Sequence, residues 1–223
     1  MRSNTEEKAP SRSGPFSFLM LRVALFFSLS CLLSFSSGTL IHPFRASASE
    51  VSEQEIDFLS GYIALHAKTH LSPLVRRQIA RSLLKESRRQ HVDLYLAIGV
   101  VEQESGFDPR ALNSASQDYG LFQVHFAFWR RYFARRVPGG LNPLQPNELF
   151  LIPVNVRVGL MILKHDLKIE KNDTVRGLGL YSGRKGSERE TYVERVLQNE
   201  ISFFAFHSSC ERKSCYSGYS GSR

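Results

Sequence analysis

Two glutamates at the end of an apolar segment are the residues of this sequence best suited to chemistry. Residues 94–101 are almost wholly apolar, Glu102 and Glu104 follow, and Asp108-Pro109 then prevents a helix from continuing. A carboxyl group at a helix end in partly apolar surroundings can have a raised pKa, which suits a proton donor to a sugar oxygen. The segment therefore indicates general acid chemistry on a glycosidic bond.

The helical pattern alone does not choose between the two glutamates. On a helix Glu102 and Glu104 point about 160° apart, so at most one of them faces a given cleft. Cleavage of a glycosidic bond needs one acid to protonate the leaving oxygen, and hydrolysis usually adds a second carboxylate. Asp118 is the candidate for that second group; the alternative is a turn residue that bonds its own backbone.

Two short motifs resemble those of the soluble-type lytic transglycosylases, the SLT-domain family, which is similar to goose-type lysozymes. Glu104-Ser105 resembles the family's Glu-Ser motif, and Gly-Leu-Phe-Gln at residues 120–123 resembles its Gly-Leu-Met-Gln motif, at a fitting spacing. Two weaker matches follow. Residues 153–159 resemble the family's Pro-x-x-Asn-Ile-x-x-Gly helix, and residues 180–183 resemble its Tyr-Asn-x-Gly segment.

The resemblance spans residues 73–200 and implies both a fold and a reaction. The implied fold is mainly α, a lysozyme-like catalytic domain over residues 71–207. Because the family's catalytic Glu directly precedes Ser, Glu104 would be the acid and base, and Glu102 a solvated surface acid. Glu104 would cleave the bond between N-acetylmuramic acid and N-acetylglucosamine and give a 1,6-anhydro product. No metal or organic cofactor is implied.

The resemblance also implies which other residues contact the glycan. Ser105 would place its hydroxyl beside the sugar, Gln123 would line the cleft, and Tyr181 would hydrogen-bond Glu104 or hold its orientation. The interpretation from residue type alone is that Ser105 is a polar helix end and Tyr181 a core tyrosine.

Further residues support or depart from this pattern. Trp129 is the best aromatic candidate for a sugar contact, and Asn155 would cap or brace the catalytic helix. Phe122 stands where the family usually has Met, an apolar replacement of tolerable volume. Ser182 stands where Asn is usual, so an amide contact at that position is not expected.

Two other functions remain open on the sequence. A hydrolytic lysozyme using Glu104 with Asp118 would release products without the anhydro ring. A non-catalytic wall-binding or secretion-accessory protein on the same fold is the second alternative. It would be expected to lack the glutamate, which is present at position 104.

Apolar periodicity predicts the helices that must position these groups. We expect helices over 73–89, 94–104, 153–170, 173–181 and 192–206, with residues 106–120 as a loop. The many arginines of the first of these helices are expected to form a solvated face.

The N-terminus is typical of an exported protein. Residues 1–48 combine a basic but mixed-charge start, an apolar stretch and a small-x-small pattern, which predicts a signal peptide. An uncleaved anchor over residues 16–40, attached to the inner membrane, is the alternative. The expected location is the periplasm or cell envelope. Residues 49–70 are expected to be a helical extension, and 208–223 a disordered Ser/Gly tail.

The composition of the chain indicates which binding partners to expect. The 223 residues carry a formal net charge of +8, which favours anionic partners such as cell-wall polymers. The chain has no compact basic and aromatic motif for nucleic acid. We therefore expect peptidoglycan glycan strands as the partner of a monomer. If Cys31 leaves with the signal peptide, Cys210 and Cys215 could close a small loop.

Overall fold

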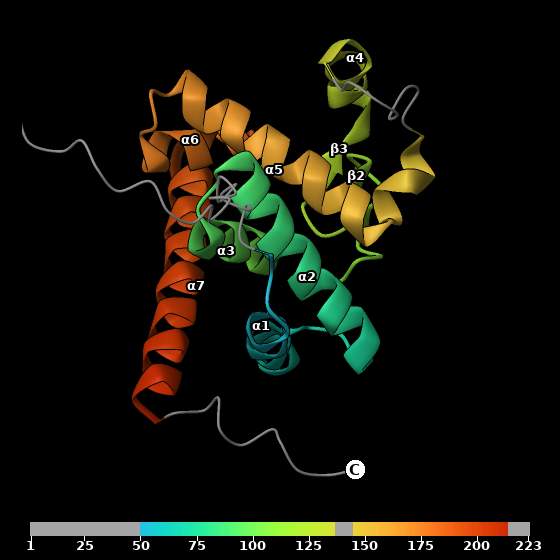
Figure 1. Ribbon diagram of the computed structural model, residues 1–223. Helices are drawn as coiled ribbons and strands as arrows, with labels where there is room; N and C mark the ends of the chain where they lie inside the picture. The colour runs from blue at the N-terminus through green and yellow to red at the C-terminus, as the bar shows by residue number, and fades with distance from the viewer. Residues whose placement is uncertain (1–49, 137–144, 214–223) are drawn as a thin grey trace, which may run out of the picture. The chain divides into compact units, whose positions relative to one another are not determined.

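The computed structural model describes residues 50–136 and 145–213, and these residues are mainly helical, as the sequence predicts. Figure 1 shows the arrangement of the helices. The elements in chain order are α1 (Glu53–His66), α2 (Pro73–Gln90), α3 (Leu94–Ser105), β1 (Leu112–Asn113), β2 (Asp118–Tyr119), β3 (Val124–His125), α4 (Phe126–Arg136), the 3-10 helix η1 (Pro146–Phe150), α5 (Ile152–Ile169), α6 (Thr174–Tyr181) and α7 (Gly186–Lys213). None of the described helices is both long and apolar enough to cross a bilayer.

Helix α3 lies in the core, and its most extensive packing is against α7 (Figure 1). All residues from Leu96 to Val101 are buried. Gly99 lets the two backbones approach closely, because a Cβ there would lie 2.6 Å from the Val196 carbonyl oxygen of α7. This contact fixes the catalytic-helix candidate against a helix that begins more than 80 residues later in the chain.

Helix α1 belongs to the same hydrophobic core as the rest of the described domain. It contributes the buried residues Ile56, Leu59 and Ile63. Its aromatic side chains meet the second half of α7, where the rings of Tyr62 and Phe203 lie 4.8 Å apart between centroids. Within the predicted extension, residues 53–66 are thus helical and packed on the domain.

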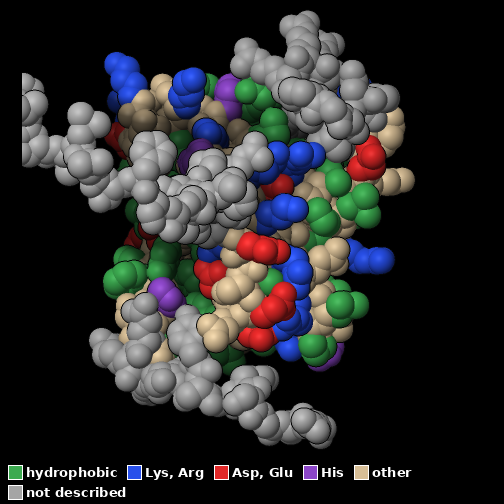
Figure 2. Space-filling model, viewed as in Figure 1, with side chains coloured by type: hydrophobic (Ala, Val, Ile, Leu, Met, Phe, Trp, Pro, Cys, Tyr) green, Lys and Arg blue, Asp and Glu red, His purple; other side chains and the backbone are tan. Residues whose placement is uncertain are grey.

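Charged side chains join α1 to α2. Arg77 pairs with Glu53 and Asp57, and Arg81 reaches Glu53 at 2.8 Å. Figure 2 shows acidic and basic side chains side by side on this face. The prediction of a merely solvated arginine face is therefore wrong in part, because several of these arginines hold α1 in place. Partly exposed pairs of this kind stabilise by about 0–1 kcal/mol each, so they guide packing more than they drive it.

Three two-residue strands form in this part of the chain: β1 and β2 interrupt residues 106–120, which are expected to be a loop, and β3 follows them. They form an antiparallel sheet in the order β1-β2-β3, in which Asn113 faces Asp118 and Asp118 faces His125. Strands this short show no alternation of apolar and polar residues, so periodicity could not reveal them. The sheet brings Asp118 and His125 to one place.

Helix α7 continues to Lys213, past residue 207 where the expected domain ends. The first residues of the expected tail, including Cys210, are therefore helical. Cys215 lies outside the described residues, as do residues 1–49 with the expected signal peptide.

Candidate active site

Glu104 lies in the last turn of α3, and the local sequence explains why the helix ends there. Asp93 caps the start of α3 by accepting a hydrogen bond from the Leu96 backbone N–H. At the other end, Gly106 is left-handed with φ 57°, and its N–H donates to the Glu102 carbonyl. Glycine adopts this conformation at little cost. The chain therefore turns away two residues after Glu104.

A cleft of about 750 Å³ opens beside this turn. Its walls come from α3, the small sheet, α4, α5 and the end of α6, so segments distant in sequence meet there. Five of the six predicted site residues line the cleft: Glu104, Asp118, Gln123, Trp129 and Tyr181.

The surroundings of Glu104 suit a proton donor near neutral pH. Burial raises the pKa of its carboxyl group from 4.5 to about 7, and the negative charge of Asp118 acts in the same direction. A hydrogen bond from Tyr192 and the charge of Arg184 oppose this rise. The carbonyl end of α3 also disfavours a negative charge at this position. Glu104 can therefore both release and recover a proton near pH 7.

Tyr192 is the residue that sequence reasoning missed. Its hydroxyl donates to Oε1 of Glu104 at 2.6 Å, and its side chain is 1% exposed on α7. The Arg184 guanidinium lies over the Tyr192 ring at 5.2 Å. One signal could have revealed Tyr192: it stands among the buried positions of α7, next to Val193, and a buried tyrosine usually needs a partner for its hydroxyl.

Glu102 does not take part in the cleft. Its carboxylate accepts a hydrogen bond from the Tyr62 hydroxyl at 2.8 Å and lies 3.0 Å from Nδ1 of His66. The Glu102 side chain is only 15% exposed. The prediction of a solvated surface acid is therefore wrong, because Glu102 holds α1 against α3. The two glutamates do face different neighbours, as their helical spacing requires.

The Gly-Leu-Phe-Gln turn is shaped by its backbone. Gly120 and Gln123 both have positive φ, at 71° and 44°. The Gln123 side-chain amide donates to the carbonyls of Gly120 at 2.9 Å and Ala111 at 3.2 Å. Phe122 is fully buried and fills the space left by Gly159 on α5. Gln123 thus lines the cleft, while Phe122 anchors the turn.

Asn155 braces this turn and not the catalytic helix, which corrects the prediction. It is 1% exposed. Its Oδ1 accepts the Phe122 N–H at 2.9 Å, and its Nδ2 donates to the carbonyls of Tyr119 at 2.8 Å and Leu149 at 2.7 Å. One amide therefore satisfies three backbone groups of the segments that form the cleft.

Tyr181 lies at the cleft, but its hydroxyl donates to the Phe122 carbonyl at 2.8 Å. The predicted hydrogen bond to Glu104 is made by Tyr192 instead. Burial raises the pKa of Tyr181, as do the charges of nearby carboxylates, with Glu104 the largest of these. Tyr181 thus remains close to the acid while it ties α6 to the turn.

Ser105 is not placed beside the cleft. Its hydroxyl donates to the Val101 carbonyl one helical turn earlier, at 3.1 Å, and the residue is buried. This is the polar helix-end role that residue type alone indicated. Ser105 is not among the residues that line the cleft.

Asp118 faces the cleft through its side chain. Its Oδ1 lies 2.9 Å from Nδ1 of His125, and its Oδ2 accepts a hydrogen bond from the Ser116 hydroxyl. Asp118 is therefore held by side chains and not by its own backbone. A second carboxylate is available in the same cleft as Glu104.

Helix α4 supplies the aromatic wall. Trp129 lines the cleft together with Phe128, which is 68% exposed. The Trp129 ring is perpendicular to those of Tyr132 and His165, at 5.3 Å from each centroid. Trp129 is thus held in a fixed orientation at the position expected for a sugar contact.

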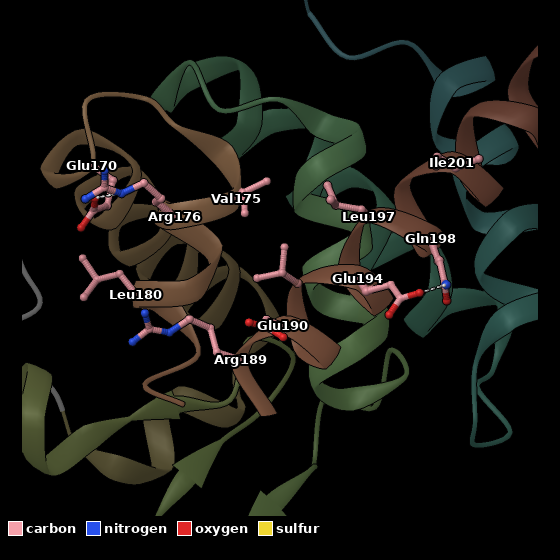
Figure 3. Close-up of a pocket in the computed structure, with 11 residues that line it drawn as sticks. Glu170, Val175, Arg176, Leu180, Arg189, Glu190, Glu194, Leu197, Gln198 and Ile201 are labelled. Carbon is pink, nitrogen blue, oxygen red and sulfur yellow. Dashed lines mark hydrogen bonds and ion pairs between the residues drawn. The ribbon is translucent and has the colours of Figure 1, made fainter. Parts of the chain in front are cut away.

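A second cavity of about 630 Å³ lies between α6 and α7 (Figure 3). Its carboxylates are exposed or paired: Glu170 binds Arg176 at 2.8 Å, and Glu194 accepts from Gln198 at 3.2 Å. It shares Leu180 with the cleft but lacks a buried acid. The cleft at Glu104 is therefore the candidate active site. Within the described residues, no three His, Cys, Asp or Glu side chains are grouped to hold a metal ion.

A partly desolvated acid beside a second carboxylate, in a cleft with an aromatic wall, is the kind of site that cleaves glycosidic bonds. The family described as "Transglycosylase SLT domain" matches residues 81–194, just over half of the chain, and the chain belongs to this family. This confirms the predicted family and the lysozyme-like, mainly α fold. Peptidoglycan cleavage of the transglycosylase type is its general function. No curated protein and no solved structure matches the chain significantly.

Proposed function

We propose that the chain is a lytic transglycosylase that cleaves the β-1,4 bond between N-acetylmuramic acid and N-acetylglucosamine, with Glu104 as acid and base. The observation that carries this proposal is the position of Glu104, which lines the cleft with Asp118 and accepts a hydrogen bond from the Tyr192 hydroxyl at 2.6 Å. Burial at this position raises the pKa of its carboxyl group to about 7. A group with this pKa is half protonated under neutral conditions. It can therefore serve in both proton transfers of a two-step reaction.

In the first step the Glu104 carboxyl group donates its proton to the glycosidic oxygen as the bond from this oxygen to the muramyl C1 breaks. The N-acetylglucosamine side leaves as an alcohol, and positive charge develops at C1. In the second step the Glu104 carboxylate takes the proton of the muramyl 6-hydroxyl, whose oxygen attacks C1. The nucleophile is already tethered to the reacting sugar, so no water has to be positioned. The product is a 1,6-anhydromuramyl end.

Tyr192 would orient the acid during this cycle. Its hydrogen bond to Oε1 holds one carboxyl oxygen, which leaves the other for the proton transfer. The same bond stabilises the carboxylate form, so it keeps the pKa of Glu104 lower than burial alone would set it. Arg184, stacked over the Tyr192 ring, acts in the same direction.

Hydrolysis is the second candidate, because Asp118 lines the same cleft and its charge acts on Glu104. In that reaction Asp118 would activate a water or stabilise the charge at C1, and the product would have a reducing muramyl end.

The products of purified peptidoglycan decide between these reactions. Mass spectrometry of fragments released by the full chain should show anhydromuramyl ends, which are lighter than reducing ends by one water. Asp118→Asn should leave the product type unchanged and lower the rate by about tenfold or less, because Glu104 and not Asp118 is the base for attack by the 6-hydroxyl. Reducing ends from the wild type would select the hydrolytic reaction, and Asp118→Asn should then abolish release.

A Tyr192→Phe variant tests how the acid is tuned. Loss of the hydroxyl removes a hydrogen bond to the carboxylate, so the pKa of Glu104 should rise above about 7. The alkaline limb of the rate against pH should move to higher pH, and the maximal rate should fall about tenfold as Glu104 loses its orientation. Tyr62→Phe is the matched control, because Tyr62 donates to Glu102 outside the cleft. An alkaline limb that moves to lower pH would contradict this role of Tyr192.

The site of action follows from the substrate. Peptidoglycan lies in the cell envelope, so we propose an envelope location, reached by export through the signal-like residues 1–48 or held by them at the inner membrane. We also propose that the chain acts as a monomer.

A further inference from the structure

A histidine and a buried aspartate on α5 face the same cleft and have no role in the reaction described above. His165 and Asp166 both line the cleft, and Nδ1 of His165 lies 2.9 Å from Oδ1 of Asp166. Asp166 is 4% exposed, whereas the His165 side chain is 29% exposed. The buried member of the pair thus lies behind the accessible one.

The pair determines which nitrogen of the imidazole is available. Burial raises the pKa of Asp166, and the bond and charge of His165 oppose that rise, so the two side chains depend on each other. An ionised carboxylate only accepts, so with Asp166 ionised the Nδ1 of His165 carries the proton of this hydrogen bond. Nε2, the other ring nitrogen, is then the one left for a ligand in the cleft.

The plane of the imidazole is also fixed. The Tyr132 and Trp129 rings are nearly perpendicular to it, at 75° and 86°, with centroids 5.1 and 5.3 Å away. Trp129 itself lines the cleft. An aromatic ring that accepts the apolar face of a sugar, next to a fixed nitrogen that hydrogen-bonds a ring substituent, is a combination that suits carbohydrate binding.

We propose that His165 is a glycan-binding residue of the cleft, with Asp166 as its positioning residue. Together with Trp129 it forms a subsite for one N-acetylated sugar of the strand. The sugar packs on Trp129, and Nε2 of His165 hydrogen-bonds a hydroxyl or acetamido group. This inference rests on the proposed function, since it takes a glycan as the ligand, but it concerns binding and not the proton transfers at Glu104.

Binding can be measured without turnover. The parent protein is the full chain with Glu104→Gln, and the probe is the β-1,4-linked tetramer of N-acetylglucosamine. Affinity is measured by calorimetry. Trp129 is the only tryptophan of the chain, so a change in its emission on addition of the tetramer places the sugar beside it.

Three changes are compared in this parent. His165→Phe keeps a ring between Trp129 and Tyr132 but removes both nitrogens, and it should weaken binding about five- to tenfold, as expected for one lost hydrogen bond. His165→Gln, which keeps a polar group, should recover part of the affinity. Asp166→Asn should weaken binding about threefold, because His165 loses its anionic partner. His70→Phe, at an exposed position between α1 and α2, is the control and should bind like the parent.

The outcomes separate this inference from the proposed function. Equal affinity of the His165→Phe variant and the parent would overturn the inference and leave the proposed function intact. Binding by calorimetry without a change in Trp129 emission would do the same. A parent that binds no tetramer would overturn the inference, while the proposed function would still be decided by the release of anhydromuramyl ends from peptidoglycan. Thermal unfolding checks that each variant is folded, and if His165→Phe is not, His165→Gln must still bind more weakly than the parent.

Discussion

Replacing Glu104 with Gln should lower the rate of peptidoglycan cleavage by about a thousandfold or more. General acid–base catalysis contributes about 10²–10⁴-fold, and here one group is asked to serve in both proton transfers. Glutamine has nearly the same shape and can still accept the Tyr192 hydroxyl hydrogen bond. It has no acidic proton to give to the leaving oxygen. The measurement is the initial rate of fragment release from purified peptidoglycan near pH 6.

The same substitution should make the protein more stable at high pH. The folded-state pKa of Glu104 is raised from 4.5 to about 7, so the folded chain holds this proton more tightly than the unfolded chain does. The contribution of Glu104 to the free energy of unfolding is then fully present below pH 4.5 and is lost as the pH rises towards 7. A shift of this size corresponds to about 3 kcal/mol. Urea unfolding should therefore find the variant equal to the wild type at pH 4 and more stable at pH 8.

Glu102→Gln is the matched control for both results. Glu102 lies on the same helix, but its carboxylate hydrogen-bonds Tyr62 and His66 of α1 and does not face the cleft. Its replacement should keep the rate within about threefold, because it removes no group that touches the glycan. A Glu104→Gln variant that keeps a tenth of the wild-type rate would exclude the single-acid mechanism. A folded Glu102→Gln variant without activity would show that Glu102 is needed for cleavage and would contradict the assignment of Glu104 as the acid.

Local chemistry placed the candidate acid at the end of one apolar helix, and the resemblance to the family's Glu-Ser motif chose Glu104 over Glu102. An apolar helix, a glycine that ends it and an Asp-Pro step all lie within about a dozen residues of Glu104. The Gly-Leu-Phe-Gln turn is equally local, since Gly120 and Gln123 set its backbone themselves. Such features survive in any fold that keeps the segment intact.

The partners of these residues could not be predicted in the same way. Tyr192 is 88 residues from Glu104 in sequence, and only the packing of α7 along α3 brings the two together. The same holds for Tyr62 and Glu102, which are 40 residues apart. Both hydrogen bonds come from helices that lie wholly or partly outside the matched residues 81–194.

Ser105 shows that a residue next to the candidate acid in a motif need not line the cleft. Its position next to the acid is local, but the direction of its hydroxyl depends on the rotamer, and a serine in a helix can bond the carbonyl four residues earlier. Here it does so with Val101. Asn155 is the opposite case. Its motif in the sequence is weak, but its side chain makes three hydrogen bonds to backbone groups of other segments.

Replacing Asn155 with Leu should lower the free energy of unfolding by about 3–5 kcal/mol. Leucine has the same branched shape and number of side-chain heavy atoms but no polar atoms, so the Phe122 N–H and the carbonyls of Tyr119 and Leu149 would be left buried without this partner. Each buried group that loses its partner costs about 1–3 kcal/mol. Urea unfolding at constant pH gives the change, with the midpoint and the slope reported separately.

Asn199→Leu is the matched control for this change. The Asn199 side chain donates a hydrogen bond to the Gly99 carbonyl at 3.3 Å, and its loss should cost less than about 1 kcal/mol. The turn that Asn155 holds also receives the Tyr181 hydroxyl through the Phe122 carbonyl. Asn155→Leu should therefore reduce cleavage even at low temperature, where the variant is still folded. Equal stability of the two variants would show that the cleft-forming turn is held by its own backbone and not by α5.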